Sequence, residues 1–306
     1  MSSSRIVAIL GATGNQGESV LRRILKDGIF TPRAITRNPS STAALELKKL
    51  GAEVVKGDTT DKASLVNALR GSVALFAVTL STYPPYSAEK PSEVTIGKTI
   101  IDAAKEVGVK FIVFSSVPGL TKLTGGRFKN VSLYDDKEEI EEYLKASGVK
   151  NASLHLGSFM ENIHTQKNLK KTESGKFAFS VPKYTPEARQ SFTWVGHDVG
   201  EAAYALLRHY DDASKIISGK VFPVVTGNMP YGEYVARIGK ALGQEISFNT
   251  IPTTGSVPYD EMFEAQAAYD GFYTSTPVPN PDLVALGAKF ATVDDFIEAE
   301  IKKRFL

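Results

Sequence analysis

The sequence contains no cysteine, only four histidines and no long uninterrupted apolar run. Without cysteine there is no disulfide, no thiolate metal site and no cysteine nucleophile. The histidines, His155, His164, His197 and His209, lack the mutual spacing of a metal site, so no metal is expected. No apolar run approaches the roughly 18 residues of a membrane span, and no basic-then-apolar leader follows Met1. We therefore expect a protein that does not enter membranes and works in the cytoplasm, with the nucleus as a second location.

The sequence also lacks a strong charge of either sign. Its 36 lysines and arginines nearly balance 34 aspartates and glutamates, which leaves a net charge of +2. Such a balance does not predict a general nucleic-acid-binding surface. A gene-regulatory role, if there is one, is therefore expected to run through protein contacts, with no direct binding of nucleic acid.

What the sequence does contain is a glycine motif close to its start, between Ile6 and Gly17. An apolar run rich in β-branched residues is followed by Gly-Ala-Thr-Gly-Asn-Gln-Gly and then by apolar residues at helical spacing, which predicts a strand, a tight turn and a helix. In such a unit Gly11 permits the turn, Gly14 lets a pyrophosphate approach the backbone and Gly17 lets the helix pack closely.

The helix that follows this turn presents free N–H groups and the positive end of its dipole to phosphates. The spacing is GxxGxxG instead of GxGxxG, so the prediction depends on the position of the motif between a strand and a helix. An ordinary tight turn is the alternative. The candidate dinucleotide-binding residues of the motif are Gly11, Ala12, Thr13, Gly14, Asn15, Gln16 and Gly17.

A basic residue follows the second predicted strand, Arg33 to Thr36. Arg37 lies 20 residues after Gly17, where an NAD-selective unit carries an acidic residue for the ribose hydroxyls. The planar guanidinium of an arginine there suits the 2′-phosphate of NADP instead. NADP(H) is therefore the predicted cofactor, and a solvated arginine in a surface turn is the alternative.

Strands and helices then alternate up to about residue 157. This alternation predicts an α/β fold, a doubly wound parallel Rossmann sheet over residues 1–157. Ligands collect beyond the carboxyl ends of parallel strands, so Asp58, Thr79 and Ser115 should line the same crevice as Gly11. Asp58 either accepts a hydrogen bond from the adenine amino group or caps the segment after it. The proline-rich loop from Leu80 to Pro91 is expected to cover the nicotinamide end.

The pattern becomes less regular over residues 158–306. Shorter strands and helices predict a smaller α+β lobe, and part of 190–226 is expected to return to the Rossmann sheet. The stretch from Phe159 to Leu169 is expected to be helical.

Five features taken together resemble the NmrA-like family, atypical relatives of the short-chain dehydrogenases, and most of all its HSCARG-type NADPH-sensor branch. They are GATGNQG, Arg37-Asn38-Pro39, the Ser-Ser pair after the fifth strand, Lys137 within DDKEEIEEYL, and Phe159-Met160-Glu161-Asn162. The resemblance covers essentially the whole chain.

The resemblance implies an NADP(H)-binding Rossmann domain with a small C-terminal lobe. It also implies that dinucleotide occupancy controls association of the protein with itself, as a homodimer, or with regulatory protein partners. By the same resemblance Lys137, Phe159 and Asn162 join Arg37 among the cofactor-binding residues. Where the sensor branch has further lysines, this chain has Ser40 or Ser41, and Thr95, so its 2′-phosphate clamp is expected to be looser.

The helix around Lys137 bears on whether the protein is an enzyme. Short-chain dehydrogenases that reduce carbonyls use a tyrosine four residues before a lysine, because the tyrosine donates a proton and the lysine lowers its pKa. Here Leu133 holds that position, and Tyr134 lies about 100° further around the helix. Tyr134 can substitute only if the start of the helix is distorted.

Lys137 therefore has three open roles. It can transfer a proton to a substrate, as the resemblance to the related isoflavone-reductase group permits, or it can donate a hydrogen bond to the nicotinamide ribose. The third role is a surface pair with Glu141, one turn later on the helix.

Two functions follow from these alternatives. The first is an NADP(H)-binding regulatory protein or redox sensor without turnover, which the missing Tyr–Lys pair favours. The second is an NADPH-dependent oxidoreductase that reduces an enone, a quinone or another small aromatic carbonyl substrate, with Lys137 or a water supplying the proton.

Overall fold

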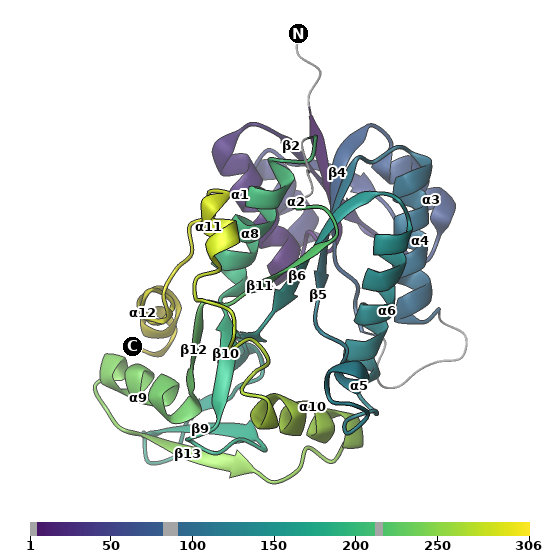
Figure 1. The fold of residues 1–306 in the computed structure, drawn as a ribbon. Helices are drawn as coiled ribbons and strands as arrows, with labels where there is room; N and C mark the ends of the chain where they lie inside the picture. Colours follow the sequence, from purple (N-terminus) through teal and green to yellow (C-terminus); the bar gives the residue numbers. More distant parts are fainter. Residues whose placement is uncertain (1–4, 82–90, 212–216) are drawn as a thin grey trace.

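The computed structural model describes residues 5–81, 91–211 and 217–306 (Figure 1). Its largest element is a seven-stranded sheet with the order β11-β6-β5-β4-β1-β2-β3, in which every neighbouring pair is parallel. The strands are β1 (Ile6–Ile9), β2 (Thr31–Thr36), β3 (Glu53–Lys56), β4 (Ser72–Ala77), β5 (Phe111–Ser116), β6 (Lys150–Leu156) and β11 (Lys220–Val224). This is the strand order of a Rossmann sheet with one strand added, so the predicted fold class is confirmed.

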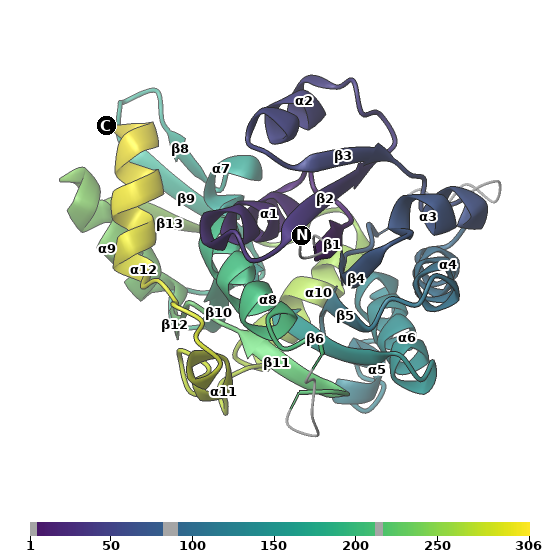
Figure 2. The ribbon, with the colours of Figure 1, turned by 90° about the horizontal axis from the view of Figure 1, so that it is seen from above.

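Both faces of this sheet are apolar, because successive side chains of a strand point to opposite faces. In β1, Val7 and Ile9 enter one core and Ala8 enters the other. Figures 1 and 2 show α1 and α8 over the first face and α3, α4 and α6 over the second. The helices of this part are α1 (Asn15–Asp27), α2 (Thr42–Lys49), α3 (Lys62–Leu69), α4 (Glu93–Glu106), α5 (Leu120–Leu123), α6 (Ser132–Ala146) and α8 (Gly200–Leu207).

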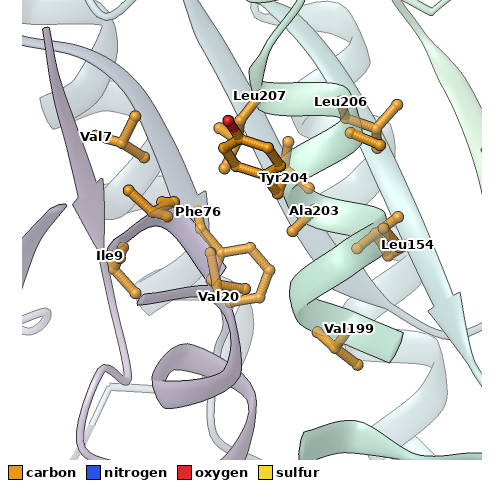
Figure 3. Packing of buried hydrophobic residues seen from close by; sticks show 14 of the residues in the cluster. Val7, Ile9, Val20, Phe76, Leu154, Val199, Ala203, Tyr204, Leu206 and Leu207 are labelled. Atoms are coloured by element: carbon orange, nitrogen blue, oxygen red, sulfur yellow. The ribbon is translucent and has the colours of Figure 1, made fainter. Parts of the chain in front are cut away.

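Helix α8, which follows the short π-helical turn η1 (Val195–Val199), is buried along its whole length. Figure 3 shows Ala203 of α8 facing Phe76 of β4, which lies beside Val20 of α1. A Cβ atom added at Gly200 would lie 2.5 Å from the backbone oxygen of Ser19 in α1, so the two helices pack in close contact. The later part of the chain thus supports the helix that follows the glycine turn.

The remaining elements form a smaller lobe (Figure 1). The chain passes into this lobe directly after the last residue of β6. Two three-stranded sheets, β12-β10-β7 and β13-β9-β8, pack with the last helices around an aromatic-rich core. The strands are β7 (Ser158–Phe159), β8 (Leu169–Lys171), β9 (Phe177–Pro182), β10 (Arg189–Thr193), β12 (Gly227–Pro230) and β13 (Ile246–Ile251). The helices are α7 (Asn162–Thr165), α9 (Tyr231–Leu242), α10 (Val257–Ala268), α11 (Pro281–Ala285), α12 (Val293–Phe296), η2 (Ile297–Lys302) and α13 (Lys303–Phe305).

The expected helix from Phe159 to Leu169 is wrong. Phe159 belongs to β7 and pairs with β10, and only α7 in the middle of the segment is helical. The cause is tertiary: the buried Glu161 carboxylate accepts hydrogen bonds from the backbone N–H groups of Val195 (3.2 Å) and Gly196 (2.7 Å). These long-range contacts outweigh a helical pattern of local sequence.

Among the described residues, no helix combines the length and the apolar composition that a bilayer span requires. The same part of the chain holds no group of three or more histidine, aspartate or glutamate side chains arranged to bind a metal ion.

A buried acid joins α6 to the sheet. Glu141 of α6 is 5% exposed, and its carboxylate lies 2.8 Å from Nε2 of His155 in β6 and 2.6 Å from Nζ of Lys145. Burial by itself would raise the pKa of Glu141, but the hydrogen bonds and charges of His155 and Lys145 outweigh it and lower the pKa to about 2.

This pKa predicts a specific loss of stability in acid. Because the pKa is lower in the folded than in the unfolded protein, the Glu141 carboxylate stabilises the fold above the unfolded pKa, and the contribution disappears as the pH falls towards 2. A shift of this size corresponds to about 3 kcal/mol. In urea unfolding, Glu141→Gln should therefore lower the free energy of unfolding by up to about this amount at pH 7, and by progressively less below pH 4. Glu142→Gln, at an exposed neighbouring position, is the control. If Glu141→Gln lowers the free energy of unfolding by the same amount from pH 7 down to pH 3, the charged carboxylate of Glu141 does not stabilise the fold.

Candidate dinucleotide site

The glycine turn between β1 and α1 has the backbone geometry that the motif predicts. Gly11 has a φ of +62°, in the left-handed region that favours glycine. A Cβ atom at Gly17 would lie 2.3 Å from the backbone oxygen of Gly11, so only glycine lets α1 begin so close to the turn. At Gly14 the nearest atom would be 3.4 Å away, an ordinary contact. The fold itself therefore does not require glycine at position 14, whereas close approach of a ligand would.

The N-terminus of α1 is open. Gly14 is its N-cap and supplies no side-chain hydrogen bond, whereas Ser41, Asp61 and Ser92 cap α2, α3 and α4. The first N–H groups of α1 and the positive end of its dipole are thus available to an anion. In addition, the buried Oε1 atom of Gln16 has no hydrogen-bond partner among the described residues. The turn fits a pyrophosphate, whereas the unsatisfied Gln16 oxygen is an acceptor and would need a donor such as a ribose hydroxyl.

Arg37 and Asp58 follow β2 and β3 at the carboxyl edge of the sheet. Arg37 is exposed. Asp58 accepts hydrogen bonds from the backbone N–H (2.9 Å) and the hydroxyl (2.8 Å) of Thr60, which together with the charge of Arg37 hold its pKa below the usual range. Asp61 caps α3. Asp58 therefore closes the turn before that helix, and its charge lies close to that of Arg37.

Lys137 is held by three acceptors at the carboxyl end of β4. Its ammonium donates to the backbone oxygen of Thr79 (3.1 Å), to the hydroxyl of Thr79 (3.0 Å) and to a carboxylate oxygen of Glu93. The Thr79 hydroxyl in turn donates to the same Glu93 oxygen over 2.5 Å. An ammonium carries three N–H donors, so this network occupies all of them. The proposed surface pair with Glu141 is wrong, because Glu141 binds His155 and Lys145.

The sequence pattern does not predict the role of Glu93. It is the first residue of α4, where an acidic side chain normally complements the helix dipole in water. In the structure Glu93 is fully buried, while Lys137 is 15% exposed. The second carboxylate oxygen of Glu93 is also buried and has no partner among the described residues. Ser92, which caps the helix, indicates where α4 begins. It does not indicate that the side chain of Glu93 is buried.

Tyr134 does not take the place of the missing catalytic tyrosine. It lies in the first turn of a regular α6, and its hydroxyl accepts a hydrogen bond from Nε2 of Gln266 in α10 over 2.7 Å. Burial raises the pKa of Tyr134 to about 12. Oε1 of Gln266 accepts a further bond from Gln190 of β10 over 2.8 Å. Tyr134 thus belongs to a buried link between the two lobes.

The other predicted site residues lie in two places. Ser115 is buried in β5, beside β4 and Thr79 at the same edge of the sheet. Phe159 and Asn162 belong to the small lobe, where both line a narrow pocket together with Tyr234. Residues 82–90, most of the loop expected to cover the nicotinamide, lie outside the described residues.

Known proteins resemble this chain in sequence. The model of the NmrA-like family matches residues 3–296. The chain belongs to the NmrA-like family. It is 34% identical over 217 residues to the NmrA-like family domain-containing oxidoreductase malD of Malbranchea aurantiaca, a match that spans 67% of this chain and 64% of malD.

Two solved structures share the fold of this NmrA-like chain. NmrA, a negative transcriptional regulator, in complex with NADP, superposes with a TM-score of 0.79 at 19% identity over 99% of this chain and 97% of NmrA. The NADPH-dependent quinone oxidoreductase QOR2 of Escherichia coli, complexed with NADPH, superposes with a TM-score of 0.69 at 22% identity over 95% of this chain and 98% of QOR2. Relatives of the chain thus include both regulators and oxidoreductases.

The buried pair predicts strong coupling between two substitutions. Lys137→Met leaves the Glu93 carboxylate buried without a cation, so urea unfolding should show a loss of about 3–5 kcal/mol. The double variant Lys137→Met/Glu93→Gln should recover about half of that loss or more, because no unpaired charge stays behind. Lys98→Met removes a lysine from an exposed pair with Glu139, and should cost less than about 1 kcal/mol. The cycle is completed by Glu93→Gln alone, and a double variant whose loss equals the sum of the losses of Lys137→Met and Glu93→Gln would show that the pair is not coupled.

Proposed function

We propose that this NmrA-like protein is an NADP(H)-binding regulatory sensor, of the kind that the HSCARG-type branch represents, in which dinucleotide occupancy controls association with a partner. The observation that carries the proposal is the state of Lys137, whose three donors are all used within the protein. Tyr134, the other candidate proton donor on α6, is buried against Gln266. Neither Lys137 nor Tyr134 thus presents a free donor to a substrate.

In this proposal residues 1–157 hold the dinucleotide. The open N-terminus of α1 and the glycine turn would hold the pyrophosphate, with Gln16 beside it, and Arg37 would pair with the 2′-phosphate. Thr79, Ser115 and Lys137 would border the nicotinamide half, and residues 158–306, with Phe159 and Asn162, would close over it from the small lobe. The solved complexes of NmrA with NADP and with NAD support a dinucleotide cofactor, and the choice of NADP(H) rests on Arg37.

A second function, NADPH-dependent reduction of an enone, quinone or aromatic carbonyl compound, is supported by the names of malD and QOR2. When bound, the cofactor would supply a hydride to the substrate carbon. Lys137 would have to release one of its three contacts to give a proton to the substrate oxygen. The neutral amine would leave the fully buried Glu93 carboxylate without a cation, so Lys137 would have to take up a proton from solvent before the next turnover.

Cofactor binding gives the first test. Arg37→Ala should weaken NADPH binding by about tenfold, since a charged hydrogen-bonding partner of the phosphate is lost, and should leave NADH binding nearly unchanged. Isothermal titration calorimetry of the purified protein measures the affinities for NADPH and for NADH. Arg208→Ala, which removes an exposed arginine after α8, is the matched control. Equal losses for NADPH and NADH would show that Arg37 does not select the 2′-phosphate, and absence of NADPH binding by the unmodified protein would refute both functions.

Turnover separates the two functions. With NADPH and a panel of quinones and enones, the sensor should show no steady loss of reduced-nicotinamide absorbance. Lys137→Arg is the informative variant, because arginine keeps the positive charge beside Glu93 but does not release a proton near neutral pH. Steady turnover that is lost in Lys137→Arg, with NADPH binding retained, would contradict the sensor and establish the reductase.

A further inference from the structure

A second hollow lies on the small lobe, separate from the residues of the dinucleotide site. Its volume is about 710 Å³, and it lies between α7, β8, the start of β9 and the C-terminal α13. Figure 2 shows the end of the chain next to β8. We call it the basic groove and define it by His164, Lys167, Lys170, Lys171, Phe177 and Phe305.

The rim of the basic groove carries unbalanced positive charge. Lys167, Lys170 and Lys171 line this one hollow, and among the described residues none of the three has a carboxylate within ion-pair distance. Arg304, at the same rim, forms an ion pair with Glu300 over 3.2 Å. A concentrated positive potential of this kind attracts an anionic ligand even when the net charge of the chain is small.

The floor of the groove is apolar and aromatic. Phe177 and Phe305 meet edge to face with their ring centroids 5.7 Å apart, and the Lys171 ammonium lies 5.6 Å from the centroid of Phe177. At the α7 side, Nδ1 of His164 is buried and has no hydrogen-bond partner among the described residues. A buried polar atom of this kind needs an explanation, and a hydrogen bond to a ligand would supply one.

The backbone of β8 favours an extended ligand. In the order β13-β9-β8 the strand β8 lies at the edge of its sheet, so its outer N–H and C=O groups have no strand neighbour in the described part of the chain. An edge strand can accept one more strand from a peptide. Its two lysines disfavour a second copy of the same edge, because like charges would face each other.

We propose that the basic groove binds an acidic, extended segment of a partner protein, with carboxylates over Lys167, Lys170 and Lys171 and one aromatic side chain against Phe305, which packs on the buried Phe177. The hollow has the size of an ordinary ligand pocket, which accommodates a bulky side chain and its neighbours. This groove would be the partner surface of the proposed sensor, and in that respect the inference rests on the proposed function.

The groove is connected to the predicted cofactor site through one helical turn. Helix α7 carries Asn162, a predicted cofactor residue, and His164 of the groove two residues later. Both ligands would thus act on the same four-residue helix. If they are coupled, NADPH must change the affinity for the segment by the same factor as the segment changes the affinity for NADPH.

The test uses the full chain and a fluorescein-labelled peptide, Glu-Asp-Glu-Phe-Asp-Glu-Glu, followed by anisotropy at low and moderate salt. The triple variant Lys167→Glu/Lys170→Glu/Lys171→Glu should weaken binding by at least about tenfold. The matched control, Lys48→Glu/Lys49→Glu/Lys240→Glu, makes the same change of charge at exposed positions outside the groove and should weaken binding by less than about threefold. Equal losses in the two variants, or no binding to the unmodified protein, would overturn the proposal.

Two further arms test the aromatic floor and the class of ligand. Replacing the peptide phenylalanine by serine, or making Phe305→Ser, should each weaken binding by about tenfold or more. A labelled oligothymidylate of equal charge should bind more weakly than the peptide, and tighter binding of the oligothymidylate would overturn the protein ligand in favour of a nucleic acid.

The last arm separates the groove from the proposed function. Peptide affinity is measured with and without saturating NADPH, after NADPH binding has been shown by titration. A change in peptide affinity supports both the groove and the sensor. Peptide binding that NADPH leaves unaltered supports the groove but contradicts its role in the sensor.

Discussion

The buried contact between Lys137 and Glu93 is the constraint around which the carboxyl edge of the sheet is arranged. It joins α6 to α4 and fixes both to Thr79 at the end of β4. The two helices can meet because Gly97 of α4 has no side chain: a Cβ atom there would lie 2.5 Å from Ile140 of α6. Removal of either charge would leave the other buried and unpaired, which is far less favourable than the intact pair. The place where α4 and α6 cross thus depends on a lysine and a glutamate that are far apart in the sequence.

Helix α6 has one polar face that serves three different contacts. Tyr134, Lys137 and Glu141 are spaced three and four residues apart, so they project from the same side of the helix. Each meets another element: Tyr134 meets α10, Lys137 meets α4 and Glu141 meets β6. One face of this charged helix is therefore buried and connects α6 to three other elements. The lysine that family resemblance associates with chemistry has a sufficient structural role in the protein.

The sequence was enough to predict the features that depend on local rules. The glycine turn, with its left-handed Gly11 and its steric need at Gly17, depends on residues close together in the chain, and alternating strands and helices predict a parallel sheet. The partner of Lys137 could not be predicted, because Glu93 lies 44 residues away and has the local pattern of an exposed helix start. The helix expected at Phe159 to Leu169 failed for the same reason, since Glu161 and Phe159 are held by β10 and the turn after it.

The near-neutral net charge does not exclude a locally charged binding surface. A sum over the chain does not describe how the charges are distributed over the surface. The small lobe concentrates unpaired lysines on the edge strand β8, next to aromatic rings and a short helix that also carries a predicted cofactor residue. A ligand can shift a conformational equilibrium only if it contacts the two states differently. Helix α7, one turn long and held by the Glu161 contacts, is the described element that both a dinucleotide and a partner segment would contact, so any difference between the bound and free states should begin there.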